Sequence, residues 1–330
     1  MSVFEASEGN LKSAGDLLRQ GKLVAFATET VYGLGANALC EAAVKSIFVA
    51  KGRPSDNPLI VHVDSIESAR ALVDMDPLSR QLAEAFWPGP LTIVVPVRPG
   101  TVAPSVTAGL STVGIRVPQH PVALALLREA RIPVAAPSCN KSGSPSPTTA
   151  AHVVADFKDS LVGPSMVIDG GQCSVGLEST VVSVDTSSGF IHILRPGKVS
   201  PELISQRLCI DENRIVRSFS VSDVEVPKAP GMKYKHYSPK AEVVSVADIG
   251  EFHFLEGDIL LAFDSTHAES VNRWSLGPDV ESASNRLFNM FRRADDVGAK
   301  RVIVDCSFDI HNGLGIALWN RISKAATHHS

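Results

Sequence analysis

The chain has 330 residues, of which 44% are hydrophobic and 20% are charged, and these values argue against a globally disordered protein. Its 31 basic and 35 acidic residues give a net charge of −4, which argues against a protein that grips nucleic acid through a large basic face. The sequence shows neither a membrane-spanning apolar run nor a signal peptide, so we expect a cytoplasmic protein without membrane contact. The five cysteines form no C-x-x-C pair, which argues against a zinc site.

The length is typical of about two domains, and the charge is divided unevenly between two parts of the chain. Residues 241–330 hold 8 basic and 13 acidic residues, whereas residues 1–240 hold 23 basic and 22 acidic residues. If one part binds an anionic ligand, the first part is therefore the better candidate.

The first part shows an irregular succession of helix and strand patterns. Apolar residues at helical spacing predict a helix over 10–20, and the apolar run 23–27 predicts a strand that leads into the polar, glycine-bearing segment Thr28–Gly35. Further helices are expected at 41–50, 66–73, 77–86, 121–130 and 149–157, and further strands at 59–63, 91–97, 113–117, 133–136, 166–168, 179–184 and 191–194. Because some strands follow one another directly, we predict an α/β fold with a mixed sheet flanked by helices.

The second part begins after a break in this pattern. Residues 218–240 contain three prolines and four lysines, which is typical of an extended linker. Beyond it, strands are expected at 243–246, 259–263 and 302–305, with helices at 279–297 and 313–326. We therefore divide the chain into a first domain (1–217), a linker (218–240) and a small C-terminal α/β domain (241–330).

Two polar segments come directly after predicted elements of the first domain. Thr28–Gly35 carries hydroxyls and a carboxylate at a strand end, where they can bind a small polar ligand or form an ordinary turn. Lys51 and Arg53 end a helix, and Pro54 and Pro58 stiffen the segment after it. These two cations can bind a polyphosphate or can merely complement the helix C-terminus.

Three further segments carry cations or hydroxyls at strand ends. Arg116 lies inside an apolar strand, so it needs an anionic partner, either a protein carboxylate or a substrate carboxylate. The loop 136–148 is rich in serine and threonine, and 176–180 and 194–197 again combine hydroxyls with an arginine. No familiar phosphate-binding loop occurs. The nearest match, Gly171–Gly176, has the glycine spacing of a P-loop, but Leu177 stands where a P-loop needs lysine. Jointly the segments predict a site that stabilises phosphoryl charge by positioning and electrostatics.

These segments also carry a family resemblance. Thr28–Gly35, KGRPSDNPL (51–59), STVGIRVP (111–118), APSCNKSGSPSPT (136–148), GLESTVV (176–182) and LRPG (194–197) resemble, in this order, the YrdC-like family of threonylcarbamoyl-adenylate synthases. The segment APGMKYKHYSPKAEV (229–243) is similar to the linker of the long, two-domain form. The resemblance implies a YrdC-like twisted mixed sheet and a small Rossmann-like C-terminal domain.

The resemblance implies a reaction in which L-threonine, bicarbonate or CO2, and ATP give L-threonylcarbamoyl-AMP and pyrophosphate. Mg²⁺ would accompany ATP, and no protein metal ligand is assigned. A separate threonylcarbamoyl-transferase complex would pass the product to tRNA, beside the anticodon. Weak or transient tRNA contact by this chain stays open.

The resemblance also implies roles for individual residues. Threonine would be bound by Thr30, His62, Arg116 and Ser179, with Arg116 on its carboxylate. ATP would be bound by Lys51, Arg53, Asn57, Thr112, Ser138, Ser146 and Arg195, with Tyr234 or Tyr237 of the linker closing over the nucleotide. Lys51, Arg53 and Arg116 are the residues expected to act in catalysis.

Two alternative functions stay open at this point. One is a non-catalytic RNA-binding or regulatory YrdC-like module, against which the negative net charge and the low aromatic content of 6% weigh. The other is carbamoyl transfer in hydrogenase maturation, which resembles a much larger protein with zinc-finger parts that this chain lacks.

Overall fold

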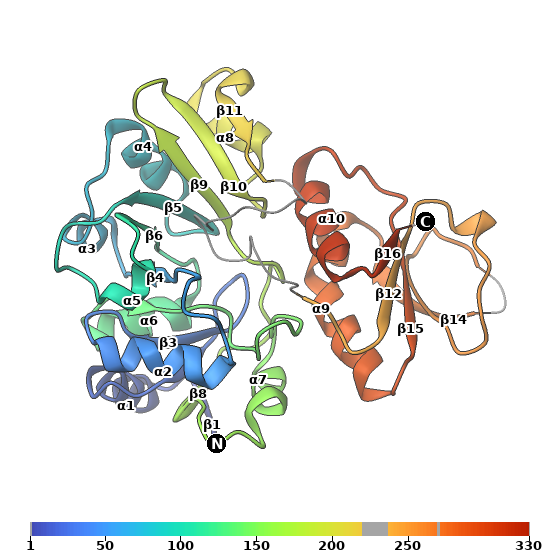
Figure 1. Ribbon diagram of the computed structural model, residues 1–330, viewed down its shortest axis with the longest axis horizontal. Coiled ribbons are helices and arrows are strands. Elements are labelled where there is room, and N and C mark those ends of the chain that lie inside the picture. Colours follow the sequence, from blue (N-terminus) through green and yellow to red (C-terminus); the bar gives the residue numbers. More distant parts are fainter. Residues whose placement is uncertain (1, 220–236, 269–270, 330) are drawn as a thin grey trace.

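The computed structural model describes residues 2–219, 237–268 and 271–329. Figure 1 shows a larger body with the N-terminus and a smaller body with the C-terminus, side by side. Each body is a sheet with helices packed on it, which confirms the predicted α/β fold class. Among the described residues, no helix combines the length and apolar character needed to cross a membrane.

The larger body is built on a mixed sheet. Its strands are β1 (Val3–Glu5), β2 (Val24–Phe26), β3 (Gly33–Asn37), β4 (Ile60–His62), β5 (Leu91–Pro96), β6 (Thr112–Arg116), β7 (Val134–Ala135), β8 (Met166–Asp169), β9 (Thr180–Asp185), β10 (Phe190–Arg195) and β11 (Ile215–Arg217). They lie in the order β1-β8-β2-β3-β7-β4-β6-β5-β9-β10-β11, with parallel and antiparallel pairs. This order places strands that are distant in sequence next to each other.

Helices cover both faces of this sheet. They are α1 (Glu8–Arg19), α2 (Glu41–Lys51), α3 (Ile66–Arg70), α4 (Pro77–Phe86), α5 (Pro104–Thr107), α6 (Pro121–Ala130), α7 (Ala150–Phe157) and α8 (Pro201–Leu208). Alternating residues of β2 point to opposite faces, so Val24 and Phe26 pack with α1 and α6, and Ala25 packs in the core that includes α2, α4 and α7. Both faces are thus buried, and ligands are left to the edges where strands end.

The smaller body contains a parallel sheet in the order β14-β13-β15-β12-β16. Its elements are β12 (Glu242–Val246), β13 (Ile259–Phe263), β14 (Asn272–Gly277), α9 (Val280–Asp296), β15 (Arg301–Asp305), α10 (Gly313–Ala325) and β16 (His328–His329). Helices α9 and α10 lie between this sheet and the larger body (Figure 1). Val31 and Leu177 of the larger body are buried in the same apolar cluster as these helices.

Several elements of the structure differ from the sequence-based prediction, and β3 bears most on the site. The segment Thr28–Gly35 has a polar, irregular pattern, but its second half is a buried antiparallel strand beside β2. A Cβ at Gly35 would lie 2.9 Å from Phe26 and 2.9 Å from Val134, so glycine is required by close packing. The prediction also missed β1, α5, α8, β11, β14 and β16.

Candidate active site

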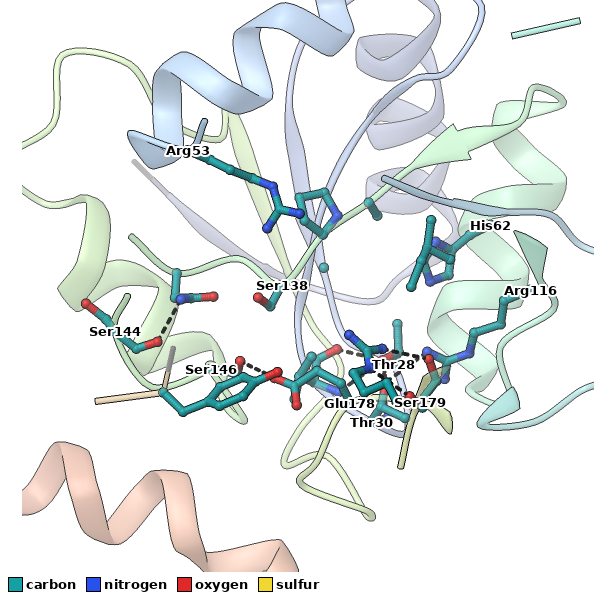
Figure 2. A pocket seen from close by; sticks show the side chains of 18 residues that line it. Thr28, Thr30, Arg53, His62, Arg116, Ser138, Ser144, Ser146, Glu178 and Ser179 are labelled. Carbon is teal, nitrogen blue, oxygen red and sulfur yellow. Dashed lines mark hydrogen bonds between the residues drawn. The ribbon is translucent and has the colours of Figure 1, made fainter. Parts of the chain in front are cut away.

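A pocket opens where several strands of the larger body begin or end (Figure 2). Thr28 follows β2, His62 ends β4, Arg116 ends β6 and Arg195 ends β10. The lining consists of Thr28, Thr30, Val31, Gly33, Arg53, Ile60, His62, Arg116, Ala136, Pro137, Ser138, Asn140, Ser144, Ser146, Glu178, Ser179, Arg195 and Tyr237. The fold therefore brings together nine of the residues expected from the sequence: Thr30, Arg53, His62, Arg116, Ser138, Ser146, Ser179, Arg195 and Tyr237.

One end of the pocket is organised by the buried guanidinium of Arg116, which is 3% exposed. Its Nη1 donates to Thr30 Oγ1 at 3.0 Å, and its Nε donates to the Gly89 carbonyl at 3.1 Å. Its Nη2 forms an ion pair with Glu29 Oε1 at 2.6 Å. The anionic partner that the sequence required is thus a protein carboxylate, and the guanidinium still faces the pocket. Nothing in the local sequence pattern singles out Glu29 as that partner.

His62 lies beside Arg116 because the two residues are aligned partners on the parallel strands β4 and β6. Burial, followed by the positive charge of Arg116, lowers the pKa of His62 to about 3. The imidazole is therefore neutral at physiological pH. Its buried Nδ1 has no hydrogen-bond partner among the described residues, so a polar ligand can bind it.

Ser179 and Arg195 connect this end to the rest of the pocket. Arg195 donates from Nε to the Ser179 carbonyl and from Nη2 to Ser179 Oγ, both at 3.1 Å. Ser179 Oγ also lies 2.8 Å from Thr92 Oγ1. These bonds fix the hydroxyl at the start of β9, where it faces the pocket.

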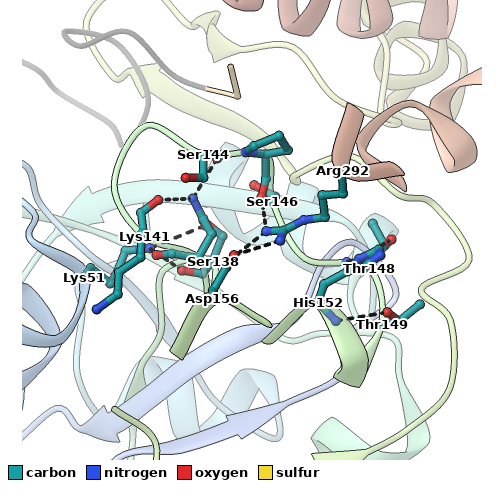
Figure 3. A network of polar contacts seen from close by, with 12 residues as sticks. Lys51, Ser138, Lys141, Ser144, Ser146, Thr148, Thr149, His152, Asp156 and Arg292 are labelled. Carbon is teal, nitrogen blue, oxygen red and sulfur yellow. Dashed lines mark hydrogen bonds and ion pairs between the residues drawn. The ribbon is translucent and has the colours of Figure 1, made fainter. Parts of the chain in front are cut away.

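The other end is formed by the loop after β7, where Ser138, Asn140, Ser144 and Ser146 face the pocket. Lys51 does not line the pocket but supports this loop from behind, since its Nζ donates to the carbonyls of Ser138 and Asn140 (Figure 3). Burial, followed by the charge of Arg53, lowers the pKa of Lys51 to about 7. Lys51 is therefore placed to orient this loop and does not face the pocket.

Four other expected ATP-binding residues have different positions relative to the pocket. Arg53 lines the pocket and donates to the Pro58 carbonyl at 3.3 Å. The Asn57 carboxamide is buried without a hydrogen bond among the described residues, but it is not part of the lining. Thr112, at the start of β6, is also outside the lining, and Tyr234 lies outside the described residues.

Glu178 is the main lining residue to which the sequence assigned no role. Its carboxylate accepts a hydrogen bond from Ser146 Oγ and one at 2.8 Å from Nε of Arg321, on α10 of the smaller body. Burial alone raises the pKa of Glu178, but Arg321, Arg195 and Ser146 outweigh it, and the net result is a lowered pKa. In the sequence this carboxylate appears only within the GLEST segment (176–180), and no local pattern there marks it as a partner of Ser146.

Tyr237 closes the pocket on the side of the smaller body. Its ring stacks on Phe288 of α9 with a centroid distance of 5.4 Å, and the Arg321 guanidinium lies 5.3 Å from its centroid. Tyr237 is 5% exposed, so an aromatic residue of the linker does lie at the pocket.

The described residues contain no group of three or more His, Cys, Asp or Glu side chains that could hold a metal ion. Within this same part of the chain, Glu178 is the sole acidic residue of the lining, and Ser146 and Arg321 already use both its oxygens. The pocket thus offers cations and hydroxyls, a donor set suited to phosphate and carboxylate oxygens.

Comparisons with known proteins agree with this chemistry. A family model described as "Telomere recombination" (Sua5_yciO_yrdC) matches residues 16–197, and one described as "Threonylcarbamoyl-AMP synthase, C-terminal domain" matches residues 199–327. The chain is 42% identical to a threonylcarbamoyl-AMP synthase of Pyrococcus abyssi, over 97% of this chain and 94% of the relative. It is 39% identical to one of Bacillus subtilis, over 98% and 94%. A crystal structure of P. abyssi Sua5 complexed with L-threonine superposes with a TM-score of 0.87 at 38% identity, covering 99% of this chain and 98% of that one.

Proposed function

The chain belongs to the threonylcarbamoyl-AMP synthase family, and we propose that it converts L-threonine, bicarbonate or CO2, and ATP into L-threonylcarbamoyl-AMP and pyrophosphate. The observation that carries the proposal is the pocket itself. A buried arginine at one end and a row of hydroxyls with two further arginines beside it provide for a carboxylate and a polyphosphate together.

Threonine binds at the Arg116 end. Its carboxylate meets the Arg116 guanidinium, which Thr30, Gly89 and Glu29 hold in place. The neutral imidazole of His62 can exchange a hydrogen bond with the threonine amine or hydroxyl without adding a second positive charge there. Ser179 Oγ completes this end.

ATP binds along the other end. Arg53 and Arg195 neutralise phosphate oxygens, and Ser138 and Ser146 donate or accept hydrogen bonds. Lys51 keeps the Ser138–Asn140 backbone in position. The Asn57 carbonyl accepts a hydrogen bond from Arg53 Nη2 at 3.5 Å and so helps to hold that arginine, and Tyr237 covers the nucleotide.

The chemistry then needs alignment more than covalent catalysis. The threonine amine adds to CO2 and loses a proton, which gives a carbamate. A carbamate oxygen forms a bond to the α-phosphorus of ATP, and the bond from that phosphorus to the pyrophosphate oxygen breaks. Arg53 and Arg195 offset the charge that builds up on the leaving pyrophosphate.

Mg²⁺ enters this scheme with ATP, as part of the substrate. It supplies charge neutralisation on the phosphates. The adenylate product is consumed by a separate transferase that modifies tRNA, so this chain has no need of a large basic surface of its own.

The test is a reconstitution with purified protein, Mg-ATP, L-threonine and bicarbonate. Pyrophosphate release should require both threonine and bicarbonate, and mass spectrometry should detect threonylcarbamoyl-AMP. If no pyrophosphate forms, or if its formation ignores threonine, the synthase assignment is wrong and the RNA-binding alternative becomes the better one. The next measurement would then be whether the protein binds RNA in the absence of nucleotide.

A further inference from the structure

The smaller body places one arginine directly behind the wall of the pocket. Arg321 is fully buried and lies on α10, yet its hydrogen bonds to the first domain go to segments of the pocket. Its Nε donates to Glu178 Oε2 at 2.8 Å, its Nη1 donates to the Pro196 carbonyl at 2.9 Å, and its Nη2 donates to the Glu178 carbonyl at 3.3 Å.

The packing around this arginine shows that the contact is built into the domain interface. Gly176, with a φ of +81°, has no room for a side chain because a Cβ would lie 2.5 Å from the Asn285 backbone of α9. The next residue, Leu177, is fully buried in the core of the smaller body together with Val31. The segments around Val31 and Leu177, which flank the pocket, are therefore held in place by the smaller body. Glu178 follows Leu177 directly in the chain.

The charges explain what Arg321 does for a ligand. Glu178 is 7% exposed and faces a pocket that must receive an anionic nucleotide. An uncompensated carboxylate there would repel phosphate and would carry the full penalty of burial. Arg321 neutralises it from the side away from the pocket, so that the carboxylate can accept the Ser146 hydroxyl and orient it.

We propose that Arg321 is a positioning residue for nucleotide binding: through Glu178 and Ser146, the C-terminal domain sets the charge and geometry of the ATP end of the pocket. The same guanidinium lies against the ring of Tyr237 and so helps to seat this aromatic cover. The inference rests on the proposed function for the identity of the nucleotide, but its physical content is a buried ion pair between two domains.

The experiment is a double-mutant cycle with Arg321→Met, Glu178→Gln and the double variant. Steady-state pyrophosphate release gives kcat and KM for ATP and for threonine, and isothermal titration gives the affinity for ATP. We expect Arg321→Met to lower kcat/KM for ATP at least tenfold in the wild-type background, mostly through KM. In the Glu178→Gln background the same change should cost less than threefold, because no charge is left uncompensated.

A merely structural role would give the same cost in both backgrounds, and that result, like an unchanged KM for ATP, would overturn the proposal. Lys198→Met is the control, since Lys198 of the larger body forms another ion pair with the smaller body, to Glu281 of α9 at 2.6 Å. Neither residue lines the pocket, so this variant should change KM for ATP less than threefold. Circular dichroism verifies folding, and the double variant keeps the cycle readable if Arg321→Met alone is unstable. ATP binding without product formation would count against the synthase assignment alone.

Discussion

The two ends of the pocket each depend on a buried carboxylate–guanidinium pair, but the pairs differ in origin. Glu29 and Arg116 both belong to the first domain, with an N–O distance of 2.6 Å. Glu178 and Arg321 are 143 residues apart and come from the larger and the smaller body, with a distance of 2.8 Å. The first pair lies within one body, whereas the second joins the two bodies. We therefore expect changes at the two ends to separate into threonine defects and ATP defects.

Removal of the Arg116 charge is the most severe way to test this separation. Arg116→Met would leave Glu29 buried without a cation and would remove the clamp for the threonine carboxylate. The loss of a buried charged partner costs about 2–5 kcal/mol, so kcat/KM for threonine should fall at least about 100-fold. KM for ATP should change less than threefold. Initial rates of pyrophosphate release, with each substrate varied in turn, measure both values.

If Arg116→Met raised the KM values for threonine and ATP equally, the two ends would not be independent. The assignment of Arg116 as the residue that binds the threonine carboxylate would then be wrong. A companion variant, Glu29→Gln, separates the two contributions of Arg116. It keeps the guanidinium but removes its protein anion, so threonine binding should suffer less than in Arg116→Met.

The converse change lies at the ATP end. Arg53→Gln removes a pocket cation whose guanidinium donates to the Asn57 and Pro58 carbonyls, so it should leave threonine binding within threefold. A hydrogen bond to a charged group is worth about 1.5–3 kcal/mol, and KM for ATP should therefore rise roughly 10- to 100-fold. The same rate assay measures this, and a larger effect on threonine than on ATP would contradict the assignment.

The contrast between the ends also explains what the sequence could predict. Arg116 stood out because a cation inside an apolar strand is anomalous, and the loop 136–148 stood out by its hydroxyls. Most helices and strands followed from apolar periodicity, and the α/β class followed from their succession. The resemblance to a family supplied the individual roles.

Other features depend on tertiary contacts that no local pattern encodes. Arg321 looks like an ordinary polar residue on an amphipathic helix, and its burial arises only when α10 docks against Glu178. Strand β3 was hidden because Gly33 and Gly35 are typical of an ordinary turn, whereas Gly35 is required because Phe26 and Val134 pack against it. Lys51 was expected in the pocket, but its ammonium points to the Ser138 and Asn140 carbonyls.

A smaller effect is expected at His62, and it has a pH signature. The unfolded chain binds a proton on this imidazole near pH 6.5, whereas the folded protein keeps it neutral down to a pKa of about 3. Acidification through this window therefore favours unfolding, and His62 contributes stability at pH 7 that is lost as the pH falls. His62→Gln should flatten the fall of Tm between pH 7 and pH 5, and raise KM for threonine roughly fivefold, the equivalent of about 1 kcal/mol.

Thermal melts at several pH values give the slope of Tm against pH for His62→Gln and for a control variant at a second histidine. His253→Gln serves as this control, since the His253 side chain is exposed and lies in the smaller body, outside the pocket lining. An unchanged pH slope in His62→Gln would show that His62 is not held neutral by burial beside Arg116.

The smallest effect is expected at Cys139, which lies in the loop after β7 but belongs to neither end of the pocket. Its side chain is fully buried in the core of the first domain, and burial raises the pKa of its thiol far above the ordinary value. A thiol of this kind is protonated and shielded, so it is a poor nucleophile. Cys139→Ala should cost about 1 kcal/mol of stability and leave both KM values within twofold.

Iodoacetamide should modify the exposed Cys209 first without loss of activity. Inactivation that parallels modification of Cys139 would instead show that this loop opens in solution, and the separation of the two ends would then have to be judged on an open pocket.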